Sequence, residues 1–193
     1  MQQGRNRTEI AEQQQSQADV TGIDRPIVLV GLMGSGKSTI GRRLANSLKL
    51  RFVDADEEIE KAADRTISEI FDEYGEKQFR DGERRVIARL IGKDPIVLAT
   101  GGGAFVNDDT RALIKRDALS IWLDADLETL VERVSRKDTR PLLRNKSPRD
   151  VLTKLAAERN PLYAEADLRV TSANGPHMAT VERILEALAQ WQS

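Results

Sequence analysis

The sequence predicts an α/β fold, a layered structure built on a mainly parallel sheet, and three observations support this prediction. Short apolar runs rich in β-branched residues recur along the chain, as is typical of strands. Longer amphipathic segments lie between them, and this alternation indicates parallel strands joined by right-handed helical crossovers. A glycine-rich loop also joins the first predicted strand to the first predicted helix.

Five segments are predicted to be strands, and several of them lack polar alternation, as expected of strands that are buried on both faces. They are residues 26–30, 51–55, 95–100, 119–123 and 168–172. The last segment of the chain has apolar residues at helical spacing, which predicts a terminal helix with one buried face. These residues are Val181, Ile184, Leu185, Leu188 and Trp191.

Residues 26–193 are predicted to form one domain, because the chain length of 193 residues suits a single core and no internal repeat is present. Residues 1–25 are rich in glutamine and other polar groups and are predicted to be a disordered tail. They lack the apolar centre of a signal peptide, and no apolar run reaches the ~20 residues that a membrane span needs. We therefore expect a cytoplasmic protein that does not enter a membrane.

The composition excludes several kinds of partner and site. The formal net charge is −1, so the charge balance does not favour nucleic acid or an anionic membrane, and anion binding must come from local arginines. The chain has no cysteine, which rules out disulfides, thiolate metal sites and cysteine nucleophiles. The single histidine, His177, lies among turn-forming residues and is expected to be a solvated loop residue.

The first predicted strand leads directly into "GLMGSGKST", residues 31–39, which matches the phosphate-binding pattern G-x-x-x-x-G-K-[ST]. In such a loop, glycines let backbone N–H groups point at phosphate oxygens, and the following helix adds its positive end. Lys37 is expected to bridge the β- and γ-phosphates of a nucleotide, and the Ser38 hydroxyl to bind Mg²⁺. The predicted ATP-binding residues of this loop are Gly34, Ser35, Gly36, Lys37, Ser38 and Thr39.

The phosphate-binding loop alone leaves a switch, a motor and a kinase open. A GTPase switch would carry an N-K-x-D motif that reads the base. The nearest match, "NKSP" at residues 145–148, has proline in place of aspartate and follows no predicted strand. Motor ATPases generally need a longer chain. A small-molecule kinase is therefore favoured.

Two aspartate pairs follow predicted strands and are candidates for the carboxylate chemistry of a kinase. Asp54 and Asp56 in "FVDADEE" come first, and alternation along a strand would turn both toward one face. Asp124 and Asp126 in "WLDADLE" repeat the pattern. In either pair the second aspartate could instead cap the helix that follows. The first pair is favoured as the functional one because it ends the strand that directly follows the helix after the phosphate-binding loop. Capping is the role expected of the second pair.

Three arginines stand where they could hold an anion, since arginine suits carboxylate and phosphate geometry. Arg80 precedes Glu83 by three residues, so a helix would let Glu83 orient its guanidinium, although a glycine between them weakens that helix. Arg159 is followed by Pro161, which is predicted to end a helix. Arg140 lies in a polar segment between two helices, which is predicted to close over phosphates as a lid.

These segments together resemble the shikimate kinase family. The resemblance rests on an ordered set of motifs that extends from Pro26 to the last helix. The set is "GLMGSGKST", "FVDAD", "ISEIFDEYGEKQFRDGE", "LATGGGAF", "DTRPLL" and "ERNPLY". A single motif such as "TGGG" would mean little, whereas the ordered set is highly specific.

The resemblance implies ATP-dependent phosphorylation of the shikimate 3-hydroxyl, which yields shikimate 3-phosphate and ADP in aromatic amino-acid biosynthesis. It implies a three-layer P-loop kinase fold with a five-stranded parallel sheet in the order 2-3-1-4-5 and a mobile lid. The implied partners are ATP and shikimate, with Mg²⁺ as cofactor and with neither nucleic acid nor a membrane. A monomer is expected.

On the acceptor side, the resemblance assigns a role to each candidate residue. Asp56 binds the shikimate hydroxyls and acts as the catalytic base, and Asp54 lies near Mg²⁺. Arg80 and Arg159 hold the shikimate carboxylate. The motif "FRDGE" is a slightly unusual version of the family's helix motif, which leaves open whether Glu83 orients Arg80.

On the nucleotide side, the resemblance places Arg133 beside adenine. Arg140 matches the lid arginine that reaches the transferring phosphate, so Arg140 and Lys37 join Asp56 as the catalytic residues. Ser38 joins Asp54 as a predicted metal-binding residue.

The triple glycine of "TGGGAF" is predicted to form the floor of the acceptor pocket. Gly101, Gly102 and Gly103 follow a strand that is expected beside the strand of the phosphate-binding loop. Without side chains at these positions, a flat ring can lie against the backbone and bond to a main-chain N–H.

Three other functions stay open on the sequence alone. A gluconate kinase phosphorylates another polyhydroxy acid with a similar phosphate-binding loop, although the triple glycine and the two separated arginines favour shikimate. A nucleoside monophosphate kinase would transfer phosphate to a nucleotide. A non-catalytic nucleotide-binding module would bind ATP without releasing ADP in response to shikimate.

Overall fold

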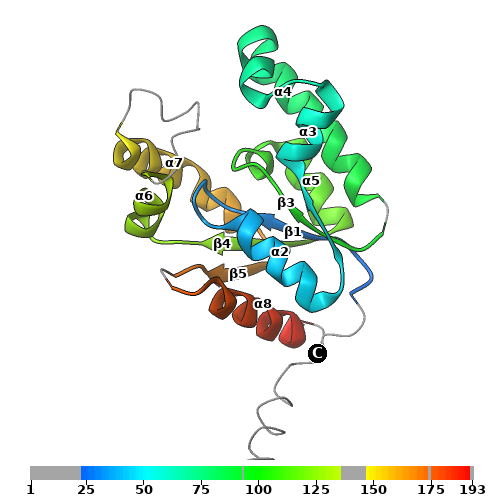
Figure 1. The fold of residues 1–193 in the computed structure, drawn as a ribbon, viewed down its shortest axis with the longest axis vertical. Coiled ribbons are helices and arrows are strands. Elements are labelled where there is room, and N and C mark those ends of the chain that lie inside the picture. Colours follow the sequence, from blue (N-terminus) through cyan, green and yellow to red (C-terminus); the bar gives the residue numbers. More distant parts are fainter. Residues whose placement is uncertain (1–22, 93, 136–146, 174, 192–193) are drawn as a thin grey trace, which may run out of the picture.

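The computed structural model describes residues 23–92, 94–135, 147–173 and 175–191. Its centre is a five-stranded sheet in the order β2-β3-β1-β4-β5, in which all neighbouring strands are parallel (Figure 1). The strands are β1 (Ile27–Val30), β2 (Arg51–Asp54), β3 (Ile96–Ala99), β4 (Leu119–Asp124) and β5 (Leu168–Thr171). The predicted order 2-3-1-4-5 is confirmed, and each strand lies within one residue of its predicted ends.

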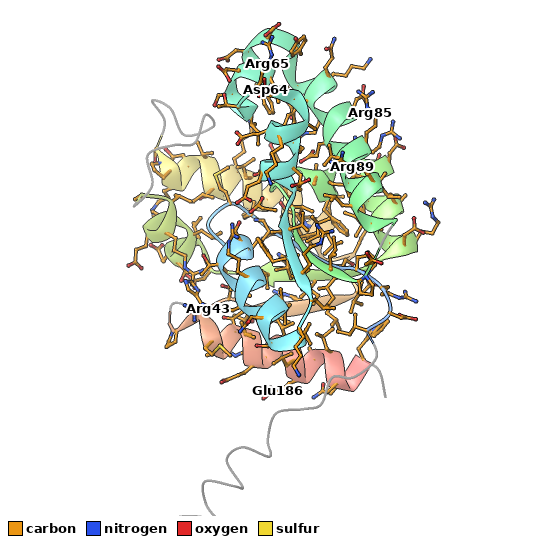
Figure 2. The ribbon with its side chains drawn as sticks, turned by 45° about the vertical axis from the view of Figure 1, so that its right-hand side comes forward. Arg43, Asp64, Arg65, Arg85, Arg89 and Glu186 are labelled. Atoms are coloured by element: carbon orange, nitrogen blue, oxygen red, sulfur yellow. The ribbon has the colours of Figure 1, made fainter. Side chains whose placement is uncertain are left out.

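Seven α-helices and one short 3-10 helix are described between and after the strands. They are α2 (Lys37–Leu48), α3 (Ala55–Ala63), α4 (Ile67–Ile91), η1 (Ala104–Val106), α5 (Asp108–Asp117), α6 (Leu127–Ser135), α7 (Pro148–Tyr163) and α8 (His177–Trp191). Exposed charged side chains cover the outer faces of these helices, as Arg85 and Arg89 do on α4 and Glu186 on α8 (Figure 2).

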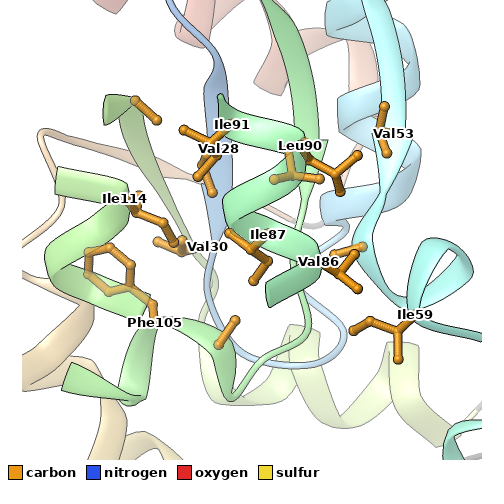
Figure 3. Close-up of a cluster of buried hydrophobic side chains, with 14 of the residues drawn as sticks. Val28, Val30, Val53, Ile59, Val86, Ile87, Leu90, Ile91, Phe105 and Ile114 are labelled. Atoms are coloured by element: carbon orange, nitrogen blue, oxygen red, sulfur yellow. The ribbon is translucent and has the colours of Figure 1, made fainter. Parts of the chain in front are cut away.

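The sheet separates two apolar cores, and successive residues of β1 point alternately into them. Ile27 and Leu29 belong to the core that α2 and α8 cover. Val28 and Val30 belong to the opposite core, where they lie near Ile87 of α4 (Figure 3). Because both faces of the central strands are buried, these strands are apolar at every position, which explains the missing alternation.

The register of the parallel strands brings the ends of β1, β2 and β3 to one edge of the sheet. Ala99 at the end of β3 pairs with Leu29 of β1 on one side and with Asp54 of β2 on the other. Side chains and loops that follow these three strands therefore gather at the same edge, as expected for an open α/β sheet.

Two helices contain residues that usually interrupt a helix. α4 contains a break at Gly75, whose φ and ψ angles are 77° and 173°. Pro161 was expected to end a helix, but it lies inside α7, which continues to Tyr163. Tyr163 is buried in the core, so its packing stabilises a last turn that the proline alone would disfavour.

Parts of the predicted organisation fall outside the described residues. These are the lid around Arg140 and residues 1–22 of the predicted tail. Ile23, which the sequence assigned to the tail, packs against the core that α2 and α8 cover. Within the described part of the chain, no helix is both long enough and apolar enough to span a membrane.

Candidate active site

The loop after β1 needs glycine at three positions. Gly31, Gly34 and Gly36 have φ angles of 135°, 85° and 94°, a backbone conformation that other residues rarely adopt. A Cβ atom on Gly31 would lie only 2.7 Å from the carbonyl oxygen of Leu123, so this position also lacks room for a side chain. The loop leads into the N-terminus of α2, where backbone N–H groups favour an anion.

Lys37 is the first residue of α2, and its side chain turns back over the loop. Its Nζ donates hydrogen bonds to the carbonyl oxygens of Gly31 and Leu32 at 2.8 and 2.9 Å. Nζ also lies 3.5 Å from Oγ of the buried Ser35. The ammonium group is therefore held directly against the phosphate-binding loop.

Asp54 connects the phosphate-binding loop with the first aspartate pair. Its Oδ2 accepts a hydrogen bond from the Ser38 hydroxyl at 2.7 Å, and its Oδ1 accepts the backbone N–H of Asp56 at 3.1 Å. Asp54 is thereby the N-cap of α3, and Asp56 lies in the first turn of that helix. The two carboxylates converge because one caps the helix that carries the other, whereas the strand alternation inferred from the sequence is not the cause.

Asp56 is a carboxylate whose charge is disfavoured by its surroundings. Burial raises its pKa, and the nearby charge of Asp54 raises the pKa further, while the Lys37 ammonium opposes the change. A carboxylate with a raised pKa binds a proton more readily than usual. This property suits a residue that accepts a proton during a reaction.

Arg80 and Glu83 form an ion pair on the inner side of α4. Nη1 of Arg80 donates to Oε2 of Glu83 at 2.6 Å, and the Glu83 side chain is only 1 % exposed. Gly82 does not interrupt the helix here. The contact that would let Glu83 orient Arg80 is therefore present. Burial raises the pKa of Glu83, against the effect of the arginine, and its Oε1 has no hydrogen-bond partner among the described residues.

The triple glycine after β3 lies against these charged side chains. A Cβ atom on Gly101 would lie 3.0 Å from Oδ1 of Asp56 and 3.1 Å from Oε1 of Glu83. A Cβ atom on Gly103 would lie 2.5 Å from Cζ of Arg80, so a side chain there would displace the guanidinium from its present position. The glycines thus let two carboxylates and a guanidinium approach the same stretch of backbone.

Gly102, between them, faces the phosphate-binding loop and α7. An added Cβ would lie 3.5 Å from the carbonyl oxygen of Gly31 and the same distance from the N atom of Met33. The Gly102 carbonyl accepts hydrogen bonds from Nη1 of Arg159, at 3.1 Å, and from the hydroxyl of Tyr163. Sequence reasoning did not single out Tyr163. Its spacing of four residues from Arg159, which puts both side chains on one face of a helix, was the available signal.

Arg133 on α6 lies on the other side of the phosphate-binding loop. Its Nη1 lies 3.3 Å from the carbonyl oxygen of Gly34 and 3.1 Å from Oγ of Ser172, and its Nη2 donates to the carbonyl of Ala173 at 2.8 Å. Arg133 therefore connects the loop to the segment after β5. Arg140, the predicted lid arginine, lies outside the described residues.

The second aspartate pair has structural contacts. Asp126 accepts the backbone N–H and the hydroxyl of Thr129, both at 2.8 Å, so the capping role predicted for it is confirmed. The same role is wrong for Asp124, whose Oδ2 accepts a hydrogen bond from Arg169 of β5 at 2.7 Å. Asp124 ends β4, and two residues separate it from the start of α6, so its side chain pairs across the sheet instead of capping.

The expectation for His177 was wrong. His177 is the first residue of α8, it is half-buried, and its Nδ1 has no hydrogen-bond partner among the described residues. Burial lowers its pKa, and the charge of Arg133 lowers the pKa further. The preceding Gly175 and Pro176 lead directly into a helix, so His177 belongs to that helix instead of a loop.

Most of the predicted residues therefore meet at one edge of the sheet. The phosphate-binding loop, the first aspartate pair, Arg80, the triple glycine and Arg159 come from different elements and form one continuous site. Among the described residues, no three His, Cys, Asp or Glu side chains gather as a metal site would need. The arrangement can hold phosphates on one side and a small acid on the other, with a proton-accepting carboxylate between them.

Comparisons of the sequence with known proteins agree on one family. A family model described as shikimate kinase matches residues 33–189. The shikimate kinase of Caulobacter vibrioides is 64% identical over 166 residues, which cover 86% of this chain and 83% of that protein. The shikimate kinase of Novosphingobium aromaticivorans is 58% identical over 173 residues, which cover 88% of this chain and 90% of that protein.

Comparisons of the fold lead to the same family. A shikimate kinase from Acinetobacter baumannii, solved in complex with shikimate, has a TM-score of 0.84 and 36% identity, with 88% of this chain and 96% of that chain covered. The shikimate kinase of Aquifex aeolicus has a TM-score of 0.73 and 34% identity, with coverages of 86% and 98%. A gluconokinase from Sinorhizobium meliloti shares the fold alone, with a TM-score of 0.55 and 19% identity over 88% of this chain and 98% of that chain.

Proposed function

This chain belongs to the shikimate kinase family, and we propose that it transfers the γ-phosphoryl group of ATP to the 3-hydroxyl of shikimate, giving shikimate 3-phosphate and ADP. One observation supports this proposal best. Asp56, Arg80 and Arg159 converge on the triple glycine directly beside the phosphate-binding loop. A phosphate donor and an acidic acceptor with hydroxyl groups would therefore meet at this point.

The phosphate-binding loop is proposed to bind ATP. Its backbone N–H groups and the N-terminus of α2 hold the phosphates, and the Lys37 ammonium exchanges its two carbonyl partners for phosphate oxygens. Arg133 lies behind the loop, next to the segment after β5, which suits a contact with adenine. Arg140 is proposed to reach the transferring phosphate from the lid.

Ser38 and Asp54 are proposed to hold Mg²⁺ together with the ATP phosphates. Their oxygens already lie 2.7 Å apart beside the loop, and hydroxyl and carboxylate oxygens are the ligands that Mg²⁺ prefers. This set is small, as expected for an ion that keeps several waters and binds substrate phosphates. When bound, the ion offsets negative charge on the phosphates.

The triple glycine and its neighbours are proposed to bind shikimate. Arg80 and Arg159 hold the carboxylate, since guanidinium groups suit that planar anion. The ion pair with Glu83 keeps Arg80 against the glycine backbone, so this arginine is ordered before the acceptor arrives. The ring of shikimate lies against Gly101–Gly103, where side chains are absent.

Asp56 is proposed to align the acceptor hydroxyl and to take its proton. The hydroxyl oxygen forms a bond to the γ-phosphorus while the bond between that phosphorus and the bridging oxygen of ADP breaks. The proton of the hydroxyl passes to Asp56, whose raised pKa favours this transfer. Lys37 and Arg140 offset the charge that moves between donor and acceptor.

Release of ADP tests the proposal directly. With ATP and Mg²⁺, we expect ADP to form rapidly when shikimate is added and only slowly without it. Gluconate at the same concentration serves as the alternative acceptor, because a gluconokinase has the same fold. ADP release with gluconate and not with shikimate would contradict the proposal. If no ADP is released with either acid, a non-catalytic nucleotide-binding module is favoured.

The cytoplasmic location and the monomeric state expected from the sequence stay predictions. Sedimentation of the purified chain at several concentrations measures the monomeric state. A mass near 21.5 kDa at every concentration is the expected result.

A further inference from the structure

Tyr163, the last residue of α7, is buried next to the triple glycine. Its side chain is 0 % exposed, and its hydroxyl donates a hydrogen bond to the Gly102 carbonyl. Burial raises the pKa of Tyr163 to about 12, against the effect of the nearby Arg159 charge. The hydroxyl therefore keeps its proton through the neutral range and acts there as a donor.

Arg159 donates to the same carbonyl from the preceding turn of α7. Its Nη1 lies 3.1 Å from the Gly102 oxygen, and a carbonyl oxygen has two lone pairs, so it accepts both bonds. Tyr163 is four residues further along the helix, on the same face. α7 thus holds one peptide group of the acceptor floor with two side chains.

The two donors differ in what happens to them when an acid binds. A carboxylate competes for the Arg159 guanidinium, because charge-assisted hydrogen bonds are stronger than those to a neutral carbonyl. A buried carbonyl oxygen left without a hydrogen-bond partner lowers the stability of the folded state. The Tyr163 hydroxyl is neutral and hence a weaker donor to a carboxylate than the guanidinium beside it, so we expect it to keep the Gly102 carbonyl paired while Arg159 turns to the substrate.

We propose that Tyr163 is a positioning residue of the acceptor site, a role that rests on the proposed function. Its hydroxyl fixes the peptide between Gly102 and Gly103 and leaves Arg159 available for the shikimate carboxylate. The same peptide leads into Gly103, where an added Cβ atom would lie 2.5 Å from Cζ of Arg80, so one hydroxyl supports the backbone beside both arginines.

Packing alone does not explain a tyrosine at this position. The ring lies 6.1 Å from the Trp122 ring, a contact that phenylalanine would make equally well. Only the hydroxyl reaches the acceptor floor. Tyr163→Phe therefore separates the proposed role from the packing role, because it removes one oxygen atom and keeps the ring.

Steady-state kinetics of Tyr163→Phe provide the first test. We expect the KM for shikimate to rise about tenfold, which is the scale of one lost hydrogen bond, while the KM for ATP and kcat change less than about twofold. The matched control is Tyr74→Phe, since Tyr74 is the other tyrosine, 44% exposed, and its hydroxyl bonds to Glu73. An unchanged KM for shikimate, or equal changes for both substrates, would overturn the proposal.

A second measurement keeps the ring and hydroxyl of Tyr163 and adds only a fluorine atom. In Tyr74→Phe, Tyr163 is the single tyrosine, so incorporated 3-fluorotyrosine gives one ¹⁹F resonance that reports on it. We expect this resonance to shift when shikimate is added and to stay in place when only ADP and Mg²⁺ are added. A resonance that ignores shikimate, in a chain that still phosphorylates it, would overturn the proposal even if Tyr163→Phe did not fold.

The two proposals fail in different ways. If the unmodified chain releases no ADP in response to shikimate, the proposed function is wrong. If the unmodified chain is active but Tyr163→Phe has the same KM for shikimate, the function stands and the role of Tyr163 is wrong.

Discussion

The tripeptide Asp-Ala-Asp begins at the last residue of both β2 and β4, and its two copies have opposite surroundings. At β2, Asp56 is half-buried, and burial together with the charge of Asp54 raises its pKa. At β4, Asp126 is exposed, and hydrogen bonds from the backbone and hydroxyl of Thr129 lower its pKa. One copy is suited to accept a proton, and the other is suited to stay ionised as a helix cap.

The difference comes from where the next helix begins. α3 starts directly after Asp54, so the first aspartate of that copy is the cap and the second lies inside the first turn, facing the glycines. α6 starts directly after Asp126, so the second aspartate is the cap and the first, Asp124, stays on the strand and pairs with Arg169. Because the helix starts two residues later at β4 than at β2, the second aspartate is the cap at β4, whereas the first aspartate is the cap at β2.

The largest effect is expected for Asp56→Asn. Turnover should fall roughly 10²-fold or more, the usual scale for losing a general base. Stability at neutral pH should not fall, because a carboxylate whose folded-state pKa is raised destabilises the folded state when ionised, and this penalty disappears as the pH drops through that pKa. Melting temperature and shikimate-dependent ADP release measure the two effects.

Asp126→Asn is the control for that variant. Asparagine caps a helix as well as aspartate does, so both stability and turnover should stay close to those of the unmodified chain. If Asp126→Asn were inactive and Asp56→Asn active, the acceptor site would lie at the copy after β4, and the roles assigned to the two copies would be wrong.

Asp54→Asn should have the next largest effect. Asparagine preserves the cap of α3 but removes the charge beside the Ser38 hydroxyl. We expect the Mg²⁺ concentration for half-maximal activity to rise roughly 10-fold to 100-fold, as when a partner of a metal site is lost. Titration of activity with Mg²⁺ measures it. The same change at the other copy, Asp124→Asn, should leave the titration curve in place, and a shift there would argue against the assignment.

The pH dependence sharpens the comparison. Because Asp56 must be ionised to accept a proton and its pKa is raised, kcat/KM should fall tenfold per pH unit below that pKa, which lies above the ordinary aspartate value of 3.8. A kcat/KM profile from about pH 4 to 8 shows this fall. In Asp56→Asn the acidic fall should vanish from the residual activity, and its persistence there would assign it to another group.

The smallest effect is expected for Asp126→Ala. Removing the cap of α6 should lower the free energy of unfolding by about 1 kcal/mol and leave turnover within about twofold. Urea denaturation followed by circular dichroism measures the loss, with Asp126→Asn as the variant that keeps the cap. Equal stability of the alanine and asparagine variants would show that the bonds to Thr129 contribute nothing.

Local patterns were sufficient for most of the fold. The five strands were predicted within one residue of their ends. β1 and β3 are buried on both faces and therefore apolar throughout, whereas the edge strands β2 and β5 are partly exposed and were recognised by their short runs of β-branched and aromatic residues. The phosphate-binding loop was equally clear, since its glycines are required by the positive φ angles of Gly31, Gly34 and Gly36. The strand order came from the resemblance of the ordered motifs to a known family, and the structure confirms it.

Local patterns failed where a distant residue decides. Pro161 predicted a helix end, but the burial of Tyr163 keeps α7 intact past it. His177 looked like a solvated loop residue, but it is the first residue of α8 and is half-buried. The role of the Tyr163 hydroxyl could not be predicted from the sequence, because its hydrogen-bond partner Gly102 lies in a distant segment of the chain.

The sequence by itself determined which residues have the chemistry of this protein: the lysine and serine of the phosphate-binding loop, the carboxylates, the arginines and the triple glycine. Only the tertiary structure decided how they are used. Through the position of each helix start, it brings the half-buried Asp56 beside the glycines and leaves Asp126 as a helix cap, and it places the Arg80 guanidinium where a side chain on Gly103 would lie. The physical reason is that charge, burial and contact depend on neighbours that the fold brings together from distant parts of the chain.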